Sequence, residues 1–187
     1  MSKSAKSDVS PPNANDLAER VKQANPKGLP PVHLWNPPFH GDLDMEIKRD
    51  GSWFYEGTPI KRPELVRLFA SILKLEEGRY YLVTPVEKVG VTVEDAPFVA
   101  VDFDIEDDGL HFETNVGDRV VAGASHLIRV EEDCETGEPS PYIHIRRGLE
   151  ALIDRKTFYR LVEIGEIEGE NVVVRSGEHS FLLGPAA

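Results

Sequence analysis

The residues best equipped for chemistry in this chain are arginines that lie beside aromatic side chains. Arg146 and Arg155 flank one predicted β-hairpin, and Arg62 follows another. Arginine presents paired N–H donors that fit the oxygens of phosphate and carboxylate groups. Tyr142 and Trp53 are close to these arginines in the sequence and offer flat surfaces for a base or ring. We therefore predict that these residues bind a small anionic, nucleotide-like ligand.

The acidity of the chain gives the same residues a competing role. The sequence holds 33 Asp and Glu against 21 Lys and Arg, for a formal net charge of −12. Each arginine can therefore pair with a carboxylate of the protein, and the aromatic rings can belong to a core. On that reading these residues have structural roles only. A protein–protein scaffold module without a small ligand is an alternative function. An enzyme of unrecognised type is a third alternative, because a site can assemble from residues that are distant in sequence.

Three potential metal ligands occupy alternate positions at the start of the first hairpin. His40, Asp42 and Asp44 would share one face of a strand, where imidazole and carboxylate groups can hold a divalent cation. Asp and Gly are also common turn residues, so a solvated turn explains the same segment. We favour the turn, and we expect neither a metal nor another cofactor.

No pattern of nucleophilic catalysis stands out. Ser125 precedes His126 directly, and adjacent side chains rarely aim at each other. The nucleophile-elbow pattern also needs a glycine two residues after the serine, where this chain has Leu127. A glycine-rich phosphate loop of the Walker or dinucleotide type is missing from the sequence. We expect no catalytic residues, and we predict that the protein is not an enzyme.

The distribution of charged and apolar residues limits the classes of partner that the protein can bind and the compartment in which we expect it. Residues 94–118 include nine acids and no Lys or Arg, a surface that repels nucleic-acid phosphates. We therefore expect no duplex nucleic acid partner. Apolar runs fall far short of the ~20 residues that a membrane-spanning helix needs. The first residues are polar, and Cys134 is the only cysteine. These features favour a cytoplasmic protein.

Hydrophobic periodicity predicts a mixture of strands and helices in the first half of the chain. Alternation over 45–48, a turn at Asp50-Gly51 and a return over 53–55 predict a hairpin. Pro63 then begins an amphipathic helix whose apolar face, including Phe69, continues to Leu75 and ends before Gly78. Strands follow at 80–83 and 86–93, and a short helix over 15–24, capped by Asn15, precedes these elements.

The second half repeats this mixture of elements. Strands are predicted at 98–105, 110–114, 120–121 and 127–130, before an acidic loop at 131–140. A second hairpin combines 142–146 with 151–153 around Gly148. Asp154 is the predicted N-cap of a helix with Phe158 and Leu161 on its buried face. A closing hairpin combines 172–174 with 181–183. The fold class is therefore α+β.

The order of elements predicts an internal duplication. Residues 45–93 and 142–183 both run as hairpin, helix and strands. We therefore expect a mobile N-terminal tail and linker at 1–34, an N-terminal unit at 35–96 and a C-terminal unit at 97–187. Clefts between such units are common ligand sites. The predicted function is a ligand-binding or signalling module that holds the anion in this cleft and reports it to a partner protein.

Six segments of the sequence resemble an uncharacterised bacterial family, the domain of unknown function 1285 family. They are residues 35–45, 50–60, 65–73, 80–88, 93–98 and 141–155. The resemblance extends over about 35–184. It implies a repeated structural motif and a C-terminal part superficially like a pleckstrin-homology fold. It also implies a site at the domain interface that suits a nucleotide-like ligand, and a role in signalling.

Overall fold

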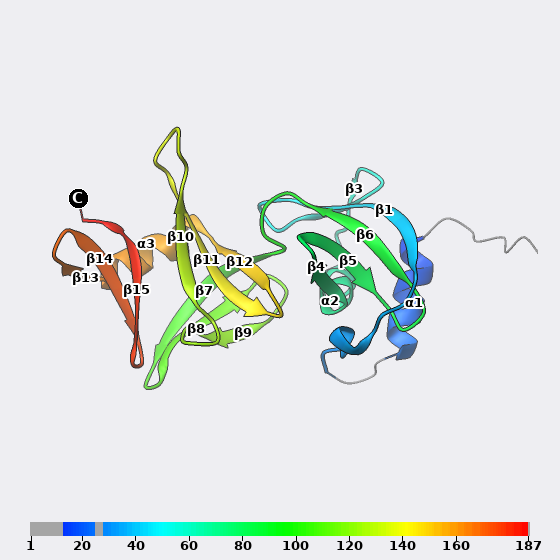
Figure 1. Cartoon of the computed structure of the whole chain (residues 1–187), viewed down its shortest axis with the longest axis horizontal. Helices are drawn as coiled ribbons and strands as arrows, with labels where there is room; N and C mark the ends of the chain where they lie inside the picture. The colour runs from blue at the N-terminus through cyan, green and yellow to red at the C-terminus, as the bar shows by residue number, and fades with distance from the viewer. Residues whose placement is uncertain (1–12, 25–27, 187) are drawn as a thin grey trace, which may run out of the picture.

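The computed structural model describes residues 13–24 and 28–186 and places them in two adjoining domains (Figure 1). Within these residues there are three α-helices, two six-stranded mixed sheets and a three-stranded C-terminal sheet. Strands make up most of the regular structure. The predicted α+β class is therefore confirmed.

The N-terminal domain is built on the first six-stranded sheet. Its strand order is β3-β2-β1-β6-β5-β4, with β1 parallel to β6 and the other pairs antiparallel. After a short 3-10 turn at Val32–Leu34, its elements are β1 (Phe39–Ile47), β2 (Trp53–Tyr55), β3 (Thr58–Pro59), α2 (Pro63–Ser71), β4 (Leu73–Glu76), β5 (Arg79–Val83) and β6 (Lys88–Val93).

The helix α2 is shorter than the sequence predicts. It ends at Ser71, and the segment expected to be its last turn forms the strand β4. Leu73 and Leu75 pair with Leu82 and Tyr80 on β5. The same apolar residues fit a helical period and an alternating period, and pairing with β5 decides between them. Gly78, with φ of +78°, forms the turn of this hairpin rather than the end of the helix.

The C-terminal domain contains the second six-stranded sheet, a helix and the small sheet. The strand orders are β10-β11-β12-β7-β8-β9 and β13-β14-β15. Its elements are β7 (Phe98–Glu106), β8 (Gly109–Thr114), β9 (Arg119–Val121), β10 (Ile128–Glu132), β11 (Pro139–Arg146), β12 (Leu149–Ile153), α3 (Arg155–Ile164), β13 (Glu166–Glu168), β14 (Asn171–Ser176) and β15 (His179–Pro185). Asp154 caps α3 as predicted, because its side chain accepts a hydrogen bond from the Thr157 N–H.

The two six-stranded sheets share one topology, but not the correspondence that the sequence suggests. In each sheet two three-stranded meanders meet where the first strand pairs in parallel with the last, β1 with β6 and β7 with β12. The β1–β2 hairpin is therefore equivalent to β7–β8, and the predicted match with β11–β12 is wrong. The helices also occupy different places, since α2 precedes β4 and α3 follows β12. A short hairpin-plus-helix pattern recurs at positions that are not equivalent.

The N-terminal helix α1 (Ala14–Ala24) belongs to the first domain. Leu17 and Val21 on one face are buried in the core cluster, and α1 lies beside α2. Arg20 adds an ion pair with Glu87, with Nη1 and Oε1 2.5 Å apart. The short helix predicted over 15–24 is thus found, with its first residue at Ala14. The side chain of Asn13, rather than that of Asn15, accepts a hydrogen bond at its start. Residues 1–12 of the predicted tail and linker lie outside the described residues.

The cores of both domains are closed by helix-face residues that the sequence identifies. Phe69 on α2 and Leu161 on α3 have no exposed surface, as predicted. The Phe69 ring stacks against Trp53 with centroids 6.4 Å apart. The stacking of Phe69 on Trp53 packs α2 against the first sheet.

Candidate functional site

Arg146 connects the two domains. Its side chain is only 14% exposed and forms an ion pair with Asp118. Its Nη2 donates a 2.8 Å hydrogen bond to the Ala70 carbonyl at the end of α2, and its Cζ lies 4.8 Å from the centroid of Phe98. These contacts engage the guanidinium across the domain boundary. The structure therefore corrects the predicted ligand-binding role of Arg146.

Tyr142 is also part of this boundary. Its hydroxyl donates a 2.8 Å hydrogen bond to Asp95 Oδ1, and the guanidinium of Arg129 lies over its ring, 4.4 Å from the centroid. Burial, followed by the hydrogen bond to Asp95, raises the pKa of the Tyr142 phenol. Because Arg129 covers the ring, Tyr142 is not a stacking surface for a ligand, contrary to the prediction.

Trp53 lies in the core and is inaccessible to a ligand. Only 1% of its surface is exposed, and Phe69 stacks against the indole. The predicted stacking role is therefore wrong. Tyr55, two residues further along β2, faces the same side of the strand and packs partly buried against the same core.

Arg155 lies at the exposed start of α3 and lines a cavity of about 360 Å³. Its Nε donates a 2.9 Å hydrogen bond to the hydroxyl of Tyr159. Arg49 reaches the same cavity from the β1–β2 hairpin, so the cavity borders both domains. Arg62 lines a different cavity, and the structure does not bring these two predicted arginines together.

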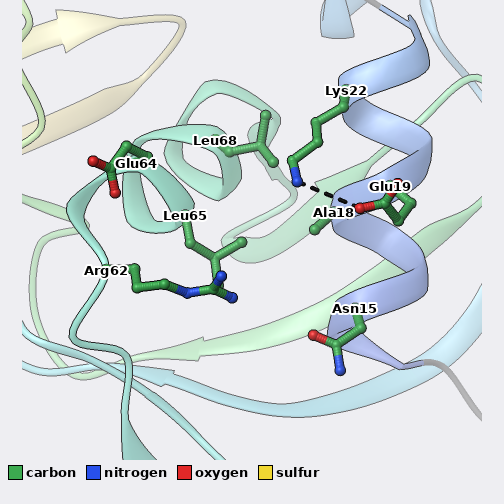
Figure 2. Close-up of a pocket in the computed structure, with 8 residues that line it drawn as sticks. All are labelled: Asn15, Ala18, Glu19, Lys22, Arg62, Glu64, Leu65 and Leu68. Atoms are coloured by element: carbon green, nitrogen blue, oxygen red, sulfur yellow. Dashed lines mark hydrogen bonds and ion pairs between the residues drawn. The ribbon is translucent and has the colours of Figure 1, made fainter.

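The cavity beside Arg62 lies between α1 and α2 and has a volume of about 580 Å³ (Figure 2). Figure 2 shows the guanidinium of Arg62 and the ammonium of Lys22 directed into the space between the helices. The described residues that line the cavity are Asn15, Ala18, Glu19, Lys22, Arg62, Glu64, Leu65 and Leu68. The cavity thus combines polar groups with an aliphatic wall.

The charges in this cavity are unevenly paired. Among the described residues, none forms an ion pair or hydrogen bond with the Arg62 guanidinium. Lys22 Nζ lies 3.4 Å from Glu19 Oε1, a surface pair that contributes little to stability. The carboxylate of Glu64 is directed away from α1 (Figure 2). A cation without a described partner therefore faces a cavity of ligand size.

Local sequence places these groups. Pro63 is the first residue of α2, where its missing N–H is harmless, and Arg62 precedes it in extended conformation. Lys22 and Asn15 lie on α1, which the sequence predicts as a short helix at 15–24 but not as a wall of a ligand site. The spacing of Leu17, Ala18 and Val21 predicts this helix and its buried face, but no local pattern predicts that the helix lies beside α2.

Two family models match the chain from one end of the described domains to the other. Residues 30–96 match "Domain of unknown function (DUF1285), N-terminal domain", and residues 97–183 match "Protein of unknown function (DUF1285), C-terminal domain". The chain belongs to the DUF1285 family. Helix α1, which forms one wall of the cavity, precedes the part that the N-terminal model matches.

Solved structures of DUF1285 proteins are similar to this chain. A DUF1285 family protein from Silicibacter pomeroyi DSS-3 is 58% identical, with a TM-score of 0.83, over 90% of this chain and 94% of that one. A DUF1285 family protein from Shewanella baltica OS155 is 33% identical, with a TM-score of 0.53, over 65% of this chain and 91% of that one. No curated protein shows significant similarity.

In this DUF1285 family member the three potential metal ligands His40, Asp42 and Asp44 do not gather into one cluster among the described residues. Asp42 pairs with Arg79, and His40 Nδ1 lies 3.7 Å from Glu87 Oε2. The one group of three potential ligand atoms within 4.8 Å of one another, among the described residues, joins Glu106, Asp108 and His111. It is explained by a 2.6 Å hydrogen bond between His111 Nε2 and Asp108 Oδ1.

The predicted serine–histidine alternative has no matching geometry in the described structure. His126 Nδ1 lies 3.0 Å from the backbone carbonyl of His144, so it faces β11. Its ring lies 5.8 Å from the ring of His144.

None of the described helices is long and apolar enough to cross a membrane.

Proposed function

We propose that this DUF1285 family member is a non-catalytic module that binds a small nucleotide-like anion between α1 and α2. The observation that carries the proposal is the Arg62 guanidinium, which faces a cavity of about 580 Å³ without a described partner. In the predicted cleft between the domains, Arg146 and Tyr142 already form hydrogen bonds with other residues of the protein. The proposal therefore moves the anion into the N-terminal domain.

The lining residues suit a ligand that has an anionic group and a ring. Arg62 donates paired hydrogen bonds to a phosphate or carboxylate, and Lys22 supplies a second positive charge. Leu65 and Leu68 form an aliphatic wall against which the ring of the ligand packs. The acidic surface of a chain with net charge −12 repels long polyanions but leaves this local attraction intact.

Because the ligand contacts both α1 and α2, its binding is coupled to the docking of α1 on the N-terminal domain. A molecule that binds only when α1 is docked stabilises the docked state by mass action. Protection of α1 from amide hydrogen exchange then reports the ligand, and a partner protein reads that change. A scaffold module, the alternative function, shows the same exchange pattern with and without nucleotides.

Calorimetry and thermal unfolding with a panel of nucleotides test the proposed function. A ligand at 100 times its Kd raises the unfolding free energy by about 2.7 kcal/mol. Arg62→Ala weakens binding by about 1.5–3 kcal/mol, because a charged hydrogen bond is lost. Arg67→Ala is the matched control, since Arg67 is an exposed cation on the same helix but does not line the cavity. The proposal fails if no nucleotide binds, or if both variants weaken binding equally.

At the level of the fold, we propose that the two six-stranded sheets are repeats of one ancestral unit. Their shared strand order supports this proposal. We also retain the likeness of the C-terminal domain to a pleckstrin-homology fold as part of it, with α3 as the closing helix. Superposition of β1–β6 on β7–β12 tests the repeat, and crossing angles that differ between equivalent strands would contradict it.

A further inference from the structure

A second groove runs along α3, separate from the cavity between α1 and α2. It consists of the cavity beside Arg155, of about 360 Å³, and a smaller one of about 240 Å³. Pro139 and Phe158 line both cavities, so the two adjoin at these side chains. Val162 lines the smaller cavity, together with Leu183 on β15.

One face of α3 forms the length of this groove. Arg155, Phe158, Tyr159 and Val162 follow the three-and-four spacing that places side chains on one side of a helix. A rise of 1.5 Å per residue separates Arg155 from Val162 by about 10 Å along the helix axis. The groove is therefore long and narrow, with different residues at its ends.

The end at Arg155 is exposed and carries charges of both signs, because Glu138 also lines it. The Nε of Arg155 donates to the Tyr159 hydroxyl, whereas no described residue accepts a hydrogen bond from its terminal nitrogens. Arg49 at the same end already has partners in the protein, because it pairs with Asp95 and donates a 3.0 Å hydrogen bond to Ser140 Oγ. The Asp154 carboxylate also has a partner, because it accepts a hydrogen bond from the Thr157 N–H as the N-cap of α3. Arg155 is thus the group at this end that can receive an anion.

The opposite end is apolar, with one acidic residue. Val162, Val172, Leu183 and Pro185 line it, and Glu132 is its charged member. An apolar chain is stabilised there by removal from water. The exposed carboxylate of Glu132 repels a second anionic group at that end.

We infer that this groove binds a medium-chain carboxylate, with its head group on Arg155 and its unbranched alkyl chain toward Val162 and Leu183. The middle of the groove favours an alkyl chain over a peptide. Pro139 has no N–H, and Phe158 offers only its ring, so a peptide backbone loses hydrogen bonds to water without replacement. An alkyl chain has none to lose.

Titration of the full chain with saturated monocarboxylates, followed by calorimetry, tests this inference. Affinity rises roughly fourfold per added methylene group until the groove is full, and then levels off. Decanedioate binds at least tenfold more weakly than decanoate, because its second carboxylate meets Glu132. Affinity that is independent of chain length, or equal for the two acids, overturns the inference. So does tighter binding of an apolar tripeptide.

Substitutions separate the head group from the tail. Arg155→Ala weakens decanoate binding about tenfold or more and leaves decanol binding unchanged. Lys156→Ala is the matched control, because Lys156 is exposed and adjacent but does not line either cavity. Val162→Asp abolishes chain-length dependence, and a thermal unfolding scan shows whether it folds. Equal effects of the Arg155 and Lys156 variants overturn the assignment of the head group, whatever nucleotides do at Arg62.

Discussion

The phenol of Tyr142 donates a hydrogen bond to Asp95 Oδ1 across 2.8 Å, which ties β11 to the segment between the domains. Arg49 of the N-terminal domain pairs with the same carboxylate. Asn115 adds a contact from the C-terminal domain, since its Nδ2 donates to the Gly51 carbonyl over 3.3 Å. The two domains are thus joined by several polar contacts, and one of them engages Tyr142, which the sequence predicts as a stacking surface for a ligand.

Replacement of Tyr142 by Phe removes this hydrogen bond. Since the acceptor is a carboxylate, the free energy of unfolding falls by about 1.5–3 kcal/mol near pH 7. Burial, and next the bond to Asp95, raise the pKa of Tyr142, so the folded state favours the neutral phenol. The contribution is therefore full below the unfolded pKa of about 10 and is lost as the pH rises through the raised value. Urea unfolding between pH 7 and pH 11 measures both effects, and the variant must show the flatter decline.

Replacement of Arg146 by Ala is expected to lower the free energy of unfolding more than replacement of Tyr142 by Phe. Arg146→Ala leaves Asp118, which is only 17% exposed, without its cation and leaves the Ala70 carbonyl without its donor. Breaking such a pair costs about 3–5 kcal/mol. Arg119→Ala is the control, because its ion pairs are exposed and each contributes about 1 kcal/mol or less. Equal losses in denaturant unfolding would show that the contacts of Arg146 with Asp118 and Ala70 stabilise the fold no more than exposed ion pairs do.

Local signals in the sequence predicted local structure well. The Asp50-Gly51 turn, the Asp154 cap and the buried positions of Phe69 and Leu161 depend on neighbouring residues, and all are found. The parallel pairing of β1 with β6 depends on strands about forty residues apart, and no short pattern encodes it. For that reason the sequence pairs the β1–β2 hairpin with β11–β12, whereas the shared strand order of the two sheets makes it equivalent to β7–β8.

The candidate site was predicted less well because arginine has two uses in an acidic chain. Arg146 and Arg62 have the same chemistry, but Asp118 lies beside the first and no described acid pairs with the second. Asp118 is 28 residues from Arg146, so their pairing follows from the sheet and not from the sequence. Lys22 was missed because the docking of α1 on α2 is likewise a tertiary contact.

Phe69 tests the packing of α2. Its ring is fully buried against Trp53, so Phe69→Ala removes the stacked ring and leaves a cavity. The expected loss is about 3–5 kcal/mol in denaturant unfolding. Val86→Ala serves as the comparison, because Val86 is 59% exposed and its truncation changes stability by about 0.5 kcal/mol or less. A loss below about 1 kcal/mol for Phe69→Ala would contradict the packing described for this helix.

Glu76 gives the protein a specific sensitivity to acid. Its carboxylate lies between two lysines, with Lys74 Nζ and Lys88 Nζ each 2.7 Å from one of its oxygens. The hydrogen bonds from Lys74, and then from Lys88, lower the pKa of Glu76 below its usual value. Since the folded pKa is depressed, the stabilisation is present above the unfolded value of about 4.3 and is lost as the pH falls through the folded one.

Glu76→Gln therefore destabilises the protein at pH 7 and has a smaller effect at pH 3, where the wild-type carboxylate is increasingly protonated. Glu163→Gln is the matched control, because Glu163 is exposed on α3 and takes part in none of the ion pairs between described residues. Its unfolding free energy must follow the wild-type curve at every pH. Chemical unfolding at intervals between pH 3 and pH 7 measures both variants. A constant difference between Glu76→Gln and wild type over this range would mean that the two lysines do not stabilise the ionised carboxylate.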